Sequence, residues 1–326
     1  MNKSAMKNSR TLRSVTLSSR SASAMLAIAL VVLFTSIAVF ASTPQGTFEK
    51  TLTVDGPVNL EVLTRSGDVT VRAGSSGSIF IRGKIYVGNR WLGTNRDAEV
   101  HEIEQHPPIR QEGNNIHVDY IDNDIKNISV NYEISVPADT VVRTRSGSGD
   151  QIIEGTRGNV DTQTGSGNVK LANLTGEIRL QTGSGDVRAH QIAGSLKGGT
   201  GSGDVEVEET SAGDIELHTG SGNVTARGIQ GGFRGETGSG DVTAEGTQTG
   251  SWEIHTGSGN VHVRLPENAA FDADISTSSG SIDVGSPIEM TVQGRVDDTH
   301  RQIHGKVHGG GPLLKVRTGS GDIHIS

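Results

Sequence analysis

The chain has 326 residues, no cysteine, 45 glycines and an aromatic content of only 3%. The absence of cysteine excludes a disulfide framework and a thiolate metal site. Residues 1–41 hold five of the 29 Lys and Arg residues and no acid, so residues 42–326 carry 24 cations against 37 Asp and Glu residues. A body this acidic argues against a protein that binds nucleic acid by neutralising its phosphates.

The N-terminus resembles an export signal. A basic lead, residues 1–23, precedes an apolar run over residues 24–41 that is interrupted only by Thr35 and Ser36. As a helix this run would span about 27 Å, close to the thickness of a bilayer. It fits either a signal peptide cleaved after Ala41 or an uncleaved membrane anchor. In both cases the basic lead stays in the cytoplasm and the acidic body is exported.

Residues 46–143 contain short strands in an irregular order. Apolar and polar residues alternate at 52–54, 69–71 and 79–81, and a short helix is predicted near 96–105, before Pro107 and Pro108. We expect this region to form the N-terminal, irregular part of the fold and to cover its open end.

Residues 144–265 carry a repeat with a period of 18 to 19 residues, built on the pattern T-x-S-G-[D/N/S]-[V/I]. Nine copies are spread over the chain, which excludes chance. They begin at Thr64, Thr164, Thr182, Thr200, Thr219, Thr237, Thr256, Thr277 and Thr318.

Each period contains two short segments with one apolar face. Ile178 and Leu180 alternate with polar residues before the Gly-Ser-Gly corner, and Val187 and Ala189 alternate after it. Alternation with a period of two indicates strands, and such short strands bury their apolar faces only when successive coils stack in parallel. The sequence therefore predicts an all-β fold, a single-stranded parallel β-solenoid with 18–19 residues per coil, preceded by one hydrophobic helix.

The corner residues have predicted structural roles. Glycine adopts positive φ at little cost, Asp and Asn tolerate turn conformations, and stacked Thr and Ser hydroxyls can hydrogen-bond along the rod. Interspersed Asn residues reduce the repulsion between stacked carboxylates. The predicted corner ladder comprises Thr164, Gly165, Ser166, Gly167, Thr182, Gly183, Ser184, Gly185, Asp186, Thr200, Gly201, Ser202, Gly203 and Asp204.

The C-terminal region, residues 266–326, contains an imperfect coil at Thr277, a loop ending at Gly309–Gly311 and a last repeat at Thr318. We expect it to cap the far end of the solenoid. Together with the Glu133–Pro137 entry segment (E-I-S-V-P), the serial coils resemble the DUF4097 family of adhesin-like bacterial envelope proteins. The resemblance covers residues 46–326 and implies a β-helical fold and an envelope location. It implies no catalytic residue.

For most other candidate sites, the residue pattern favours a structural role. Calcium is disfavoured because Asp186 directly follows its glycine, unlike in calcium-binding nonapeptide repeats, and because Asn replaces Asp in other coils. The histidines lack zinc-hydrolase spacing, and no serine lies in a nucleophile elbow. Trp252 is predicted to fill the core, whereas Trp91, in a loop, is the candidate contact residue on the surface.

Each coil supplies only about four inward side chains, chiefly Val, Ile, Leu and Ala, which fill the narrow core, so any ligand must bind on the outside or at an end. The outer column from Arg179 to Glu253 mixes cations and anions, which favours ion pairs on a solvated surface over the clustered carboxylates of a glycosidase. We therefore expect a non-enzymatic, exported envelope protein that serves as an adhesin-like surface or scaffold. The ligand would be a glycan or a protein, with no cofactor and no metal. The alternative is a carbohydrate-active β-helix enzyme, a polysaccharide lyase or glycosidase.

Overall fold

The computed structural model describes residues 43–88, 96–121, 127–285, 295–296 and 301–326. The chain divides into two compact units, Met1–Thr43 and Pro44–Ser326. The predicted export segment, residues 24–41, lies outside the described residues. In the described part of the chain, no helix has both the length and the apolar character needed to cross a bilayer.

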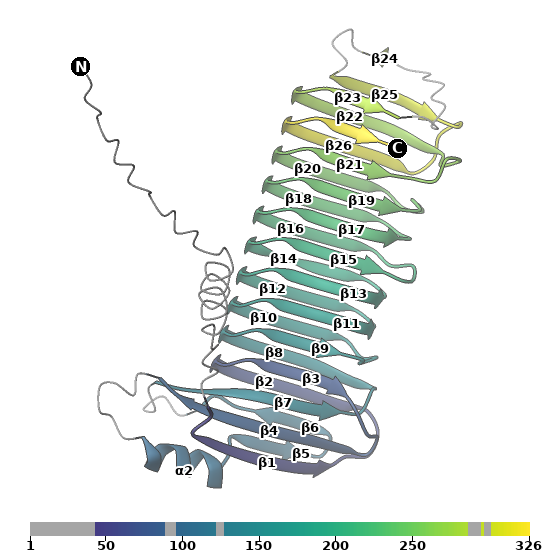
Figure 1. Cartoon of the computed structure of the whole chain (residues 1–326). Helices are drawn as coiled ribbons and strands as arrows, with labels where there is room; N and C mark the ends of the chain where they lie inside the picture. Colours follow the sequence, from purple (N-terminus) through teal and green to yellow (C-terminus); the bar gives the residue numbers. More distant parts are fainter. Residues whose placement is uncertain (1–42, 89–95, 122–126, 286–294, 297–300) are drawn as a thin grey trace, which may run out of the picture. The chain divides into compact units, whose positions relative to one another are not determined.

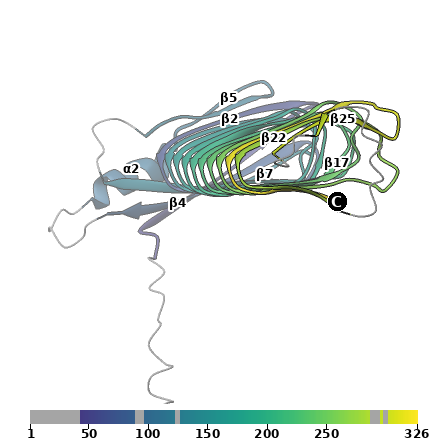
Figure 2. The same cartoon turned by 90° about the horizontal axis from the view of Figure 1, so that it is seen from above.

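The second unit is a parallel β-solenoid, as the repeat predicts. Its strands form two long sheets that face each other, and ten coils each contribute one strand to each sheet (Figure 1). Seen along the rod, successive coils superpose as flattened loops (Figure 2). Neighbouring coils pair in register, as Val160, Thr162 and Thr164 do with Ile178, Leu180 and Thr182. The prediction of the fold class is confirmed.

We call the two faces of the solenoid sheet A and sheet B. In spatial order, the coil strands of sheet B are β2 (Val58–Ser66), β8 (Thr140–Ser148), β10 (Val160–Ser166), β12 (Ile178–Ser184), β14 (Leu196–Ser202), β16 (Ile215–Ser221), β18 (Phe233–Ser239), β20 (Trp252–Ser258), β26 (Leu313–Ser320) and β22 (Phe271–Ser279). Those of sheet A are β3 (Val69–Ala73), β9 (Gln151–Glu154), β11 (Val169–Thr175), β13 (Val187–Ala193), β15 (Val205–Glu209), β17 (Val224–Ile229), β19 (Val242–Gly246), β21 (Val261–Arg264), β27 (Ile323–Ile325) and β23 (Ile282–Val284).

The core between the sheets is filled by inward side chains in columns. One column of sheet B alternates large and small residues: Leu180, Gly198, Leu217, Gly235 and Ile254. The alternation is steric, because a Cβ on Gly235 would lie 2.7 Å from the Phe233 ring, and one on Gly198 would lie 2.5 Å from the Leu180 side chain. The core therefore interdigitates as a packed interior does.

Two aromatic side chains also pack in this core. Trp252 is fully buried, as predicted, and its indole Nε1 donates a hydrogen bond to the carbonyl oxygen of Gly231 at 3.0 Å. The Phe233 ring meets the Trp252 ring edge-on, with 5.8 Å between centroids. The indole thus combines a large apolar contact with a satisfied polar atom.

A few polar side chains also lie inside. Thr144 and Thr162 are buried, and their hydroxyls hydrogen-bond to each other across two coils at 2.7 Å. Gln151 occupies the column position held by Val69 and Val169 in the neighbouring coils. Its side-chain amide is fully buried and has no hydrogen-bonding partner among the described residues.

The N-terminal end is closed by antiparallel strands and a helix. The expected helix is α2 (Asp97–Gln105), which packs on β1 (Gly46–Thr53) and buries Val100 and Ile103. The entry segment containing Glu133–Pro137 lies mostly in β7 (Ile128–Val136), which pairs in parallel with β3 and antiparallel with β4 (Ser78–Val87). On the other sheet, β5 (Ile109–Glu112) and β6 (Asn115–Val118) extend the edge beyond β2.

The C-terminal end departs from chain order. The last coil, β26 and β27, does not stack on the outside but lies between β20/β21 and β22/β23. Beyond β22, the sheet ends with β25 (Gln302–Val307), which is antiparallel to β22, and β24 (Arg295–Val296), which is antiparallel to β25.

Candidate binding surface

The Thr-x-Ser-Gly corners form one narrow edge of the rod. The threonine side chains are buried, and most donate a hydrogen bond to a glycine carbonyl of the preceding coil, as Thr182 does to Gly167 at 2.9 Å. The serines, from Ser166 to Ser258, are exposed in a single column. The threonines thus hold the coils together, and the serines face solvent.

The glycines of this edge are required by close stacking. Gly167 has a φ of 149°, and a Cβ there would lie 2.1 Å from the carbonyl oxygen of Gly149 in the coil below. The same approach recurs at Gly185 and Gly203. A larger residue would therefore separate two coils, which explains why the pattern repeats so strictly.

The Asp and Asn residues of the corner form a continuous ladder, which we call the Asx ladder. In each coil the side-chain Oδ1 accepts a hydrogen bond from the backbone N–H of the equivalent residue in the next coil, at 2.7–3.1 Å. The ladder ends at Ser281, which donates through both its N–H and its hydroxyl. Its members are Asp68, Asp150, Asn168, Asp186, Asp204, Asn223, Asp241, Asn260, Asp322 and Ser281.

Adjacent carboxylates in the ladder are compensated. Asp186 and Asp204 are neighbours, and Arg188 forms an ion pair with Asp186 at 2.9 Å. Asp68 lies beside Asp150 and accepts a hydrogen bond from the Asn131 amide at 3.0 Å. The hydrogen bonds from Ser281 lower the pKa of Asp322. The ladder therefore has a structural role, and the carboxylates of Asp68, Asp186 and Asp322 already have hydrogen-bond or ion-pair partners.

The outer face of sheet B carries a second column, which we call the B charge column. From one coil to the next its charge alternates, except where Arg179 adjoins Lys197. In spatial order it consists of Glu61, Arg143, Asp161, Arg179, Lys197, Glu216, Arg234, Glu253, Lys315 and Asp274.

Most members of this column pair across coils. Lys197 contacts Glu216 at 2.6 Å, and Arg234 contacts Glu253 at 3.2 Å. Arg179 differs, because it pairs with Glu177 of its own coil at 2.5 Å. The hydrogen bond from Lys315 lowers the pKa of Glu253, so this carboxylate stays ionised. Exposed pairs of this kind contribute only about 0–1 kcal/mol each.

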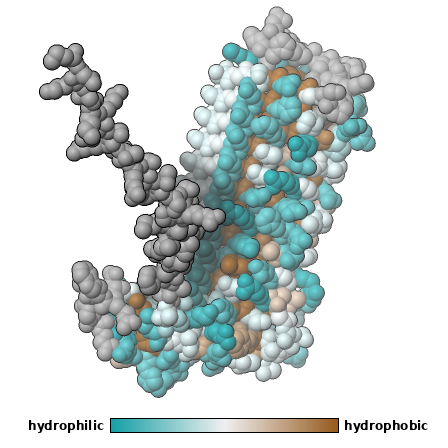
Figure 3. Space-filling view, in the orientation of Figure 1, coloured by the Kyte–Doolittle hydropathy of each residue, from teal (hydrophilic) through white to brown (hydrophobic). Residues whose placement is uncertain are grey.

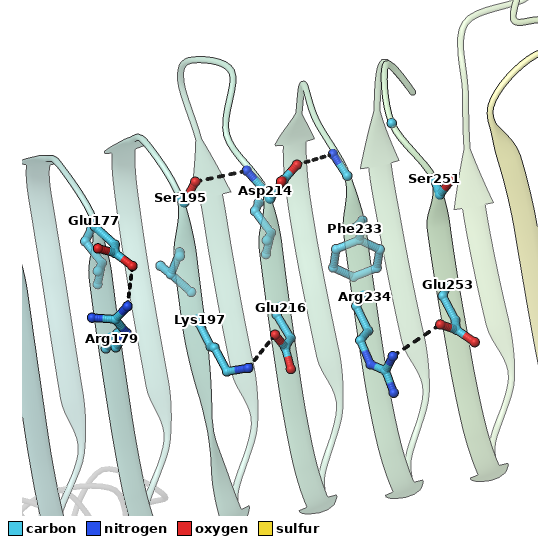
Figure 4. Close-up of a pocket in the computed structure, with 15 residues that line it drawn as sticks. Glu177, Arg179, Ser195, Lys197, Asp214, Glu216, Phe233, Arg234, Ser251 and Glu253 are labelled. Atoms are coloured by element: carbon cyan, nitrogen blue, oxygen red, sulfur yellow. Dashed lines mark hydrogen bonds and ion pairs between the residues drawn. The ribbon is translucent and has the colours of Figure 1, made fainter.

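A shallow groove with a volume of about 660 Å³ runs over five coils of this face, from β12 to β20. Its sides carry Glu177 and Arg179 of one coil and Lys197, Glu216 and Arg234 of the next three coils (Figure 4). Ile178, Leu196, Ile215 and Phe233 also border it, but their side chains are buried in the core. The space-filling view shows a stripe of hydrophobic residues between rows of hydrophilic ones along the rod (Figure 3).

The corner beside the groove is also ordered by hydrogen bonds. The Ser195 hydroxyl oxygen accepts a hydrogen bond from the backbone N–H of Asp214 at 3.4 Å, and Asp214 Oδ1 accepts one from that of Gly232 at 2.9 Å (Figure 4). These hydrogen bonds hold the corner beside the groove in place. Chemically, the groove offers paired cations and anions at intervals of one coil.

The other sequence candidates are dispersed. His218 and His255 lie exposed on sheet B with Glu236 between them, and His304 pairs with Asp274 at 3.2 Å. Within the described ranges, no three His, Asp or Glu side chains lie close enough to hold a metal ion. Trp91, the predicted contact residue, lies outside the described residues.

Sequence reasoning missed two features. The first is the Asx ladder. Asp and Asn both carry an Oδ1 atom, so their alternation at the corner could have predicted a hydrogen-bond acceptor in every coil. The groove was not anticipated, although the outer column that forms one side of it was. Its depth depends on how the charged side chains of neighbouring coils lie against one another, which the sequence pattern does not specify.

Comparisons with known proteins point to one family. The search of curated proteins finds no match. Among solved structures, a "putative adhesin" from Bacteroides fragilis NCTC 9343 is 13% identical, with 86% of this chain and 98% of that chain covered and a TM-score of 0.34. A "putative cell adhesion protein" from Clostridium sporogenes ATCC 15579 is 12% identical, with 86% and 99% covered and a TM-score of 0.25.

A third structure, a "putative lipid binding protein" from Parabacteroides distasonis ATCC 8503, is 12% identical, with 86% and 97% covered and a TM-score of 0.32. Values this low support no transfer of function. The sequence model described as Toastrack DUF4097 matches residues 59–326, most of the chain and nearly all of the solenoid. The resemblance seen in the repeats is confirmed: the chain belongs to the DUF4097 family.

Proposed function

We propose that this chain is an exported, non-enzymatic protein of the bacterial cell envelope that binds an extended ligand along the outer face of sheet B. The observation that carries the proposal is the groove over β12–β20, whose walls repeat the same side-chain positions in five consecutive coils. A surface that repeats along one axis suits a ligand that is itself long and repetitive, such as a glycan chain or an extended protein segment.

The packed core supports an external site. Inward columns are filled by residues such as Leu217, Ile254 and Trp252, so the described interior of the rod is occupied by its own side chains. The groove carboxylates support binding rather than hydrolysis. Glu216 pairs with Lys197, and Glu253 pairs with Arg234 and Lys315. The hydrogen bond from Lys315 lowers the pKa of Glu253, so this carboxylate does not supply the protonated acid that glycoside cleavage requires.

Affinity on this face would come from many small contributions. Each exposed pair exchanged with a ligand changes the free energy by about 1 kcal/mol or less. The rod, however, holds all positions in register, so the entropy cost of ordering the surface is met during folding rather than during binding. Binding should therefore strengthen steeply with the length of the ligand.

The proposed location rests on the N-terminal segment. Residues 24–41 would either anchor the protein in the cytoplasmic membrane with the solenoid outside or be removed after Ala41 to release it. Fractionation of cells, followed by N-terminal sequencing of the recovered protein, distinguishes the two. An N-terminus at Ser42 identifies cleavage, and an intact chain in the membrane fraction identifies an anchor.

The function is tested by binding of the full-length chain to a glycan array and to cell-wall fractions. The informative variant exchanges one ion pair, Lys197→Glu with Glu216→Lys, which keeps the pair but inverts the charge pattern in the groove. We expect unchanged thermal stability and at least a tenfold loss of affinity.

The matched control inverts an ion pair on sheet A, Arg264→Glu with Glu245→Arg, whose side chains lie 3.1 Å apart. It should bind as the wild type does. Equal binding by both variants would place the ligand elsewhere. Release of reducing ends or unsaturated products from any glycan would instead establish the carbohydrate-active enzyme.

A further inference from the structure

The last coil of the solenoid is inserted out of sequence. From β8 to β21, coils stack in the order in which they occur in the chain, but β26 and β27 lie between β20/β21 and β22/β23. The coil formed by β22 and β23 therefore precedes it in sequence yet lies beyond it in space. We call residues Leu313–Ser326 the closing coil and the space that it fills the slot.

The closing coil is bonded on both sides. Toward β20, Gly259 N–H donates to the Ser320 carbonyl oxygen at 2.9 Å, and toward β22, Gly321 N–H donates to that of Ser279 at 2.9 Å. Asp322 occupies the Asx ladder between Asn260 and Ser281. The slot thus has unpaired strands on both faces whenever this coil is absent.

Side chains of the closing coil complete the core as well as the surface. Leu314, Val316 and Ile323 are fully buried. Outside, Lys315 contacts Glu253 at 2.5 Å and Arg317 contacts Asp274 at 3.6 Å. The slot therefore matches this segment in its backbone hydrogen bonds, its buried side chains and its surface charges. The same segment from another copy of the chain would fit it equally well.

The connection to the closing coil is built as a hinge. Three consecutive residues, His308, Gly309 and Gly310, have positive φ values of 46°, 91° and 89°, and Gly311 and Pro312 follow. Because glycine adopts many backbone conformations at little steric cost, Gly309 and Gly310 allow the chain to take another path here.

We propose that the closing coil is exchangeable, and that it docks into the slot of a second copy of this chain to form a swapped dimer. Every contact described above is kept in the exchanged form, because only the partner that supplies it changes. The balance between the two forms is therefore set by the hinge and by protein concentration. Reciprocal exchange would join two rods at their C-terminal ends and present two outer faces in one particle, which raises avidity for a repetitive ligand.

The experiment uses the absence of native cysteine. Ser258 and Ser320 are exposed and face each other in register across the edge of the slot. Full-length chains carrying either Ser258→Cys or Ser320→Cys, each with a different affinity tag, are mixed at high concentration under native conditions and oxidised mildly. Exchange places the two cysteines side by side and yields a disulfide-linked heterodimer in excess of both homodimers.

The control pair is Ser184→Cys mixed with Ser202→Cys, which are equivalent corner serines in register in the middle of the rod. These coils cannot exchange without unfolding the rod, so we expect no excess of heterodimer. Equal cross-linking in the two mixtures overturns the proposal.

A second measurement does not depend on cysteine. Deleting Gly310 shortens the hinge, which hinders closure within one chain but not between two. Light scattering should then show a larger dimer fraction than in the wild type, rising with concentration. A deletion variant that is folded and remains monomeric at every concentration overturns the proposal.

Discussion

Glu209 is a charged residue in an apolar place. It continues the core column of Ile192, at the end of β15, and is only 4% exposed. Its Oε2 accepts a hydrogen bond from the Gln230 N–H at 3.1 Å, while Oε1 has no partner in the described structure. Burial raises the pKa of Glu209 to about 7, and the nearby Asp214 carboxylate adds to the shift.

This environment predicts that stability decreases as pH rises. The folded carboxyl binds its proton more tightly than the unfolded one, so between pH 4.5 and about 7 the folded state holds more protons. The contribution of Glu209 to the unfolding free energy should be highest below this window and lower above it, by at most about 3 kcal/mol at 1.36 kcal/mol per pKa unit. Urea denaturation across this range measures the effect.

The variant Glu209→Gln should remove most of that pH dependence and be more stable than the wild type above pH 7. The matched control is Glu208→Gln, because Glu208 is exposed and pairs with His190 on the surface. It should leave the profile nearly unchanged. A Glu209→Gln profile that still falls across the window would assign the titration to another group.

At the scale of the strand and its corner, the Asx ladder gives a direct test of hydrogen bonding against charge. Asn223 lies between Asp204 and Asp241, accepting the N–H of Asp241. Asn223→Ala removes the acceptor and should lower the unfolding free energy by about 1 kcal/mol, independently of salt. Asn223→Asp keeps the acceptor but places four carboxylates in a row, from Asp186 to Asp241.

The destabilisation of Asn223→Asp should therefore be large at low ionic strength and shrink at high ionic strength, where screening is effective. Chemical denaturation at two salt concentrations separates the variants. Asn260→Asp, flanked by Asp241 and Asp322, serves as an independent repeat of the same geometry. Equal salt dependence in the Ala and Asp variants would show that repulsion does not act in the ladder.

Strands and corners were predictable because their signals are local. Period-two alternation, as in Ile178 and Leu180, fixes which side chains face inward, and the Gly-Ser-Gly corner fixes where each strand ends. The helix over residues 97–105 was likewise marked by the prolines that follow it. The groove was not predictable, because its depth depends on contacts between coils rather than within one.

At the scale of the whole molecule, the stacking order of the last coils could not be predicted from the sequence. The repeats beginning at Thr277 and Thr318 carry nearly the same corner pattern, so either could follow β20 with similar pairing. The structure places the later one first, with Thr256 beside Thr318 and Thr318 beside Thr277. Similar repeats predict that the coils stack in register, but they do not predict which coil follows which.

This order predicts that the C-terminus is essential for stability. Ending the chain after Pro312 removes Leu314, Val316, Ile323 and Ile325 from the core, each worth about 1.5–3 kcal/mol when fully buried. It also uncovers the side of Trp252 that faces Leu314. In a Trp91→Phe background, where Trp252 is the remaining tryptophan, we expect red-shifted fluorescence and a large fall in the unfolding midpoint. Leu313→Ala, at an exposed position of β26, should change neither, whereas an unshifted spectrum in the truncated chain would show that the closing coil does not cover Trp252.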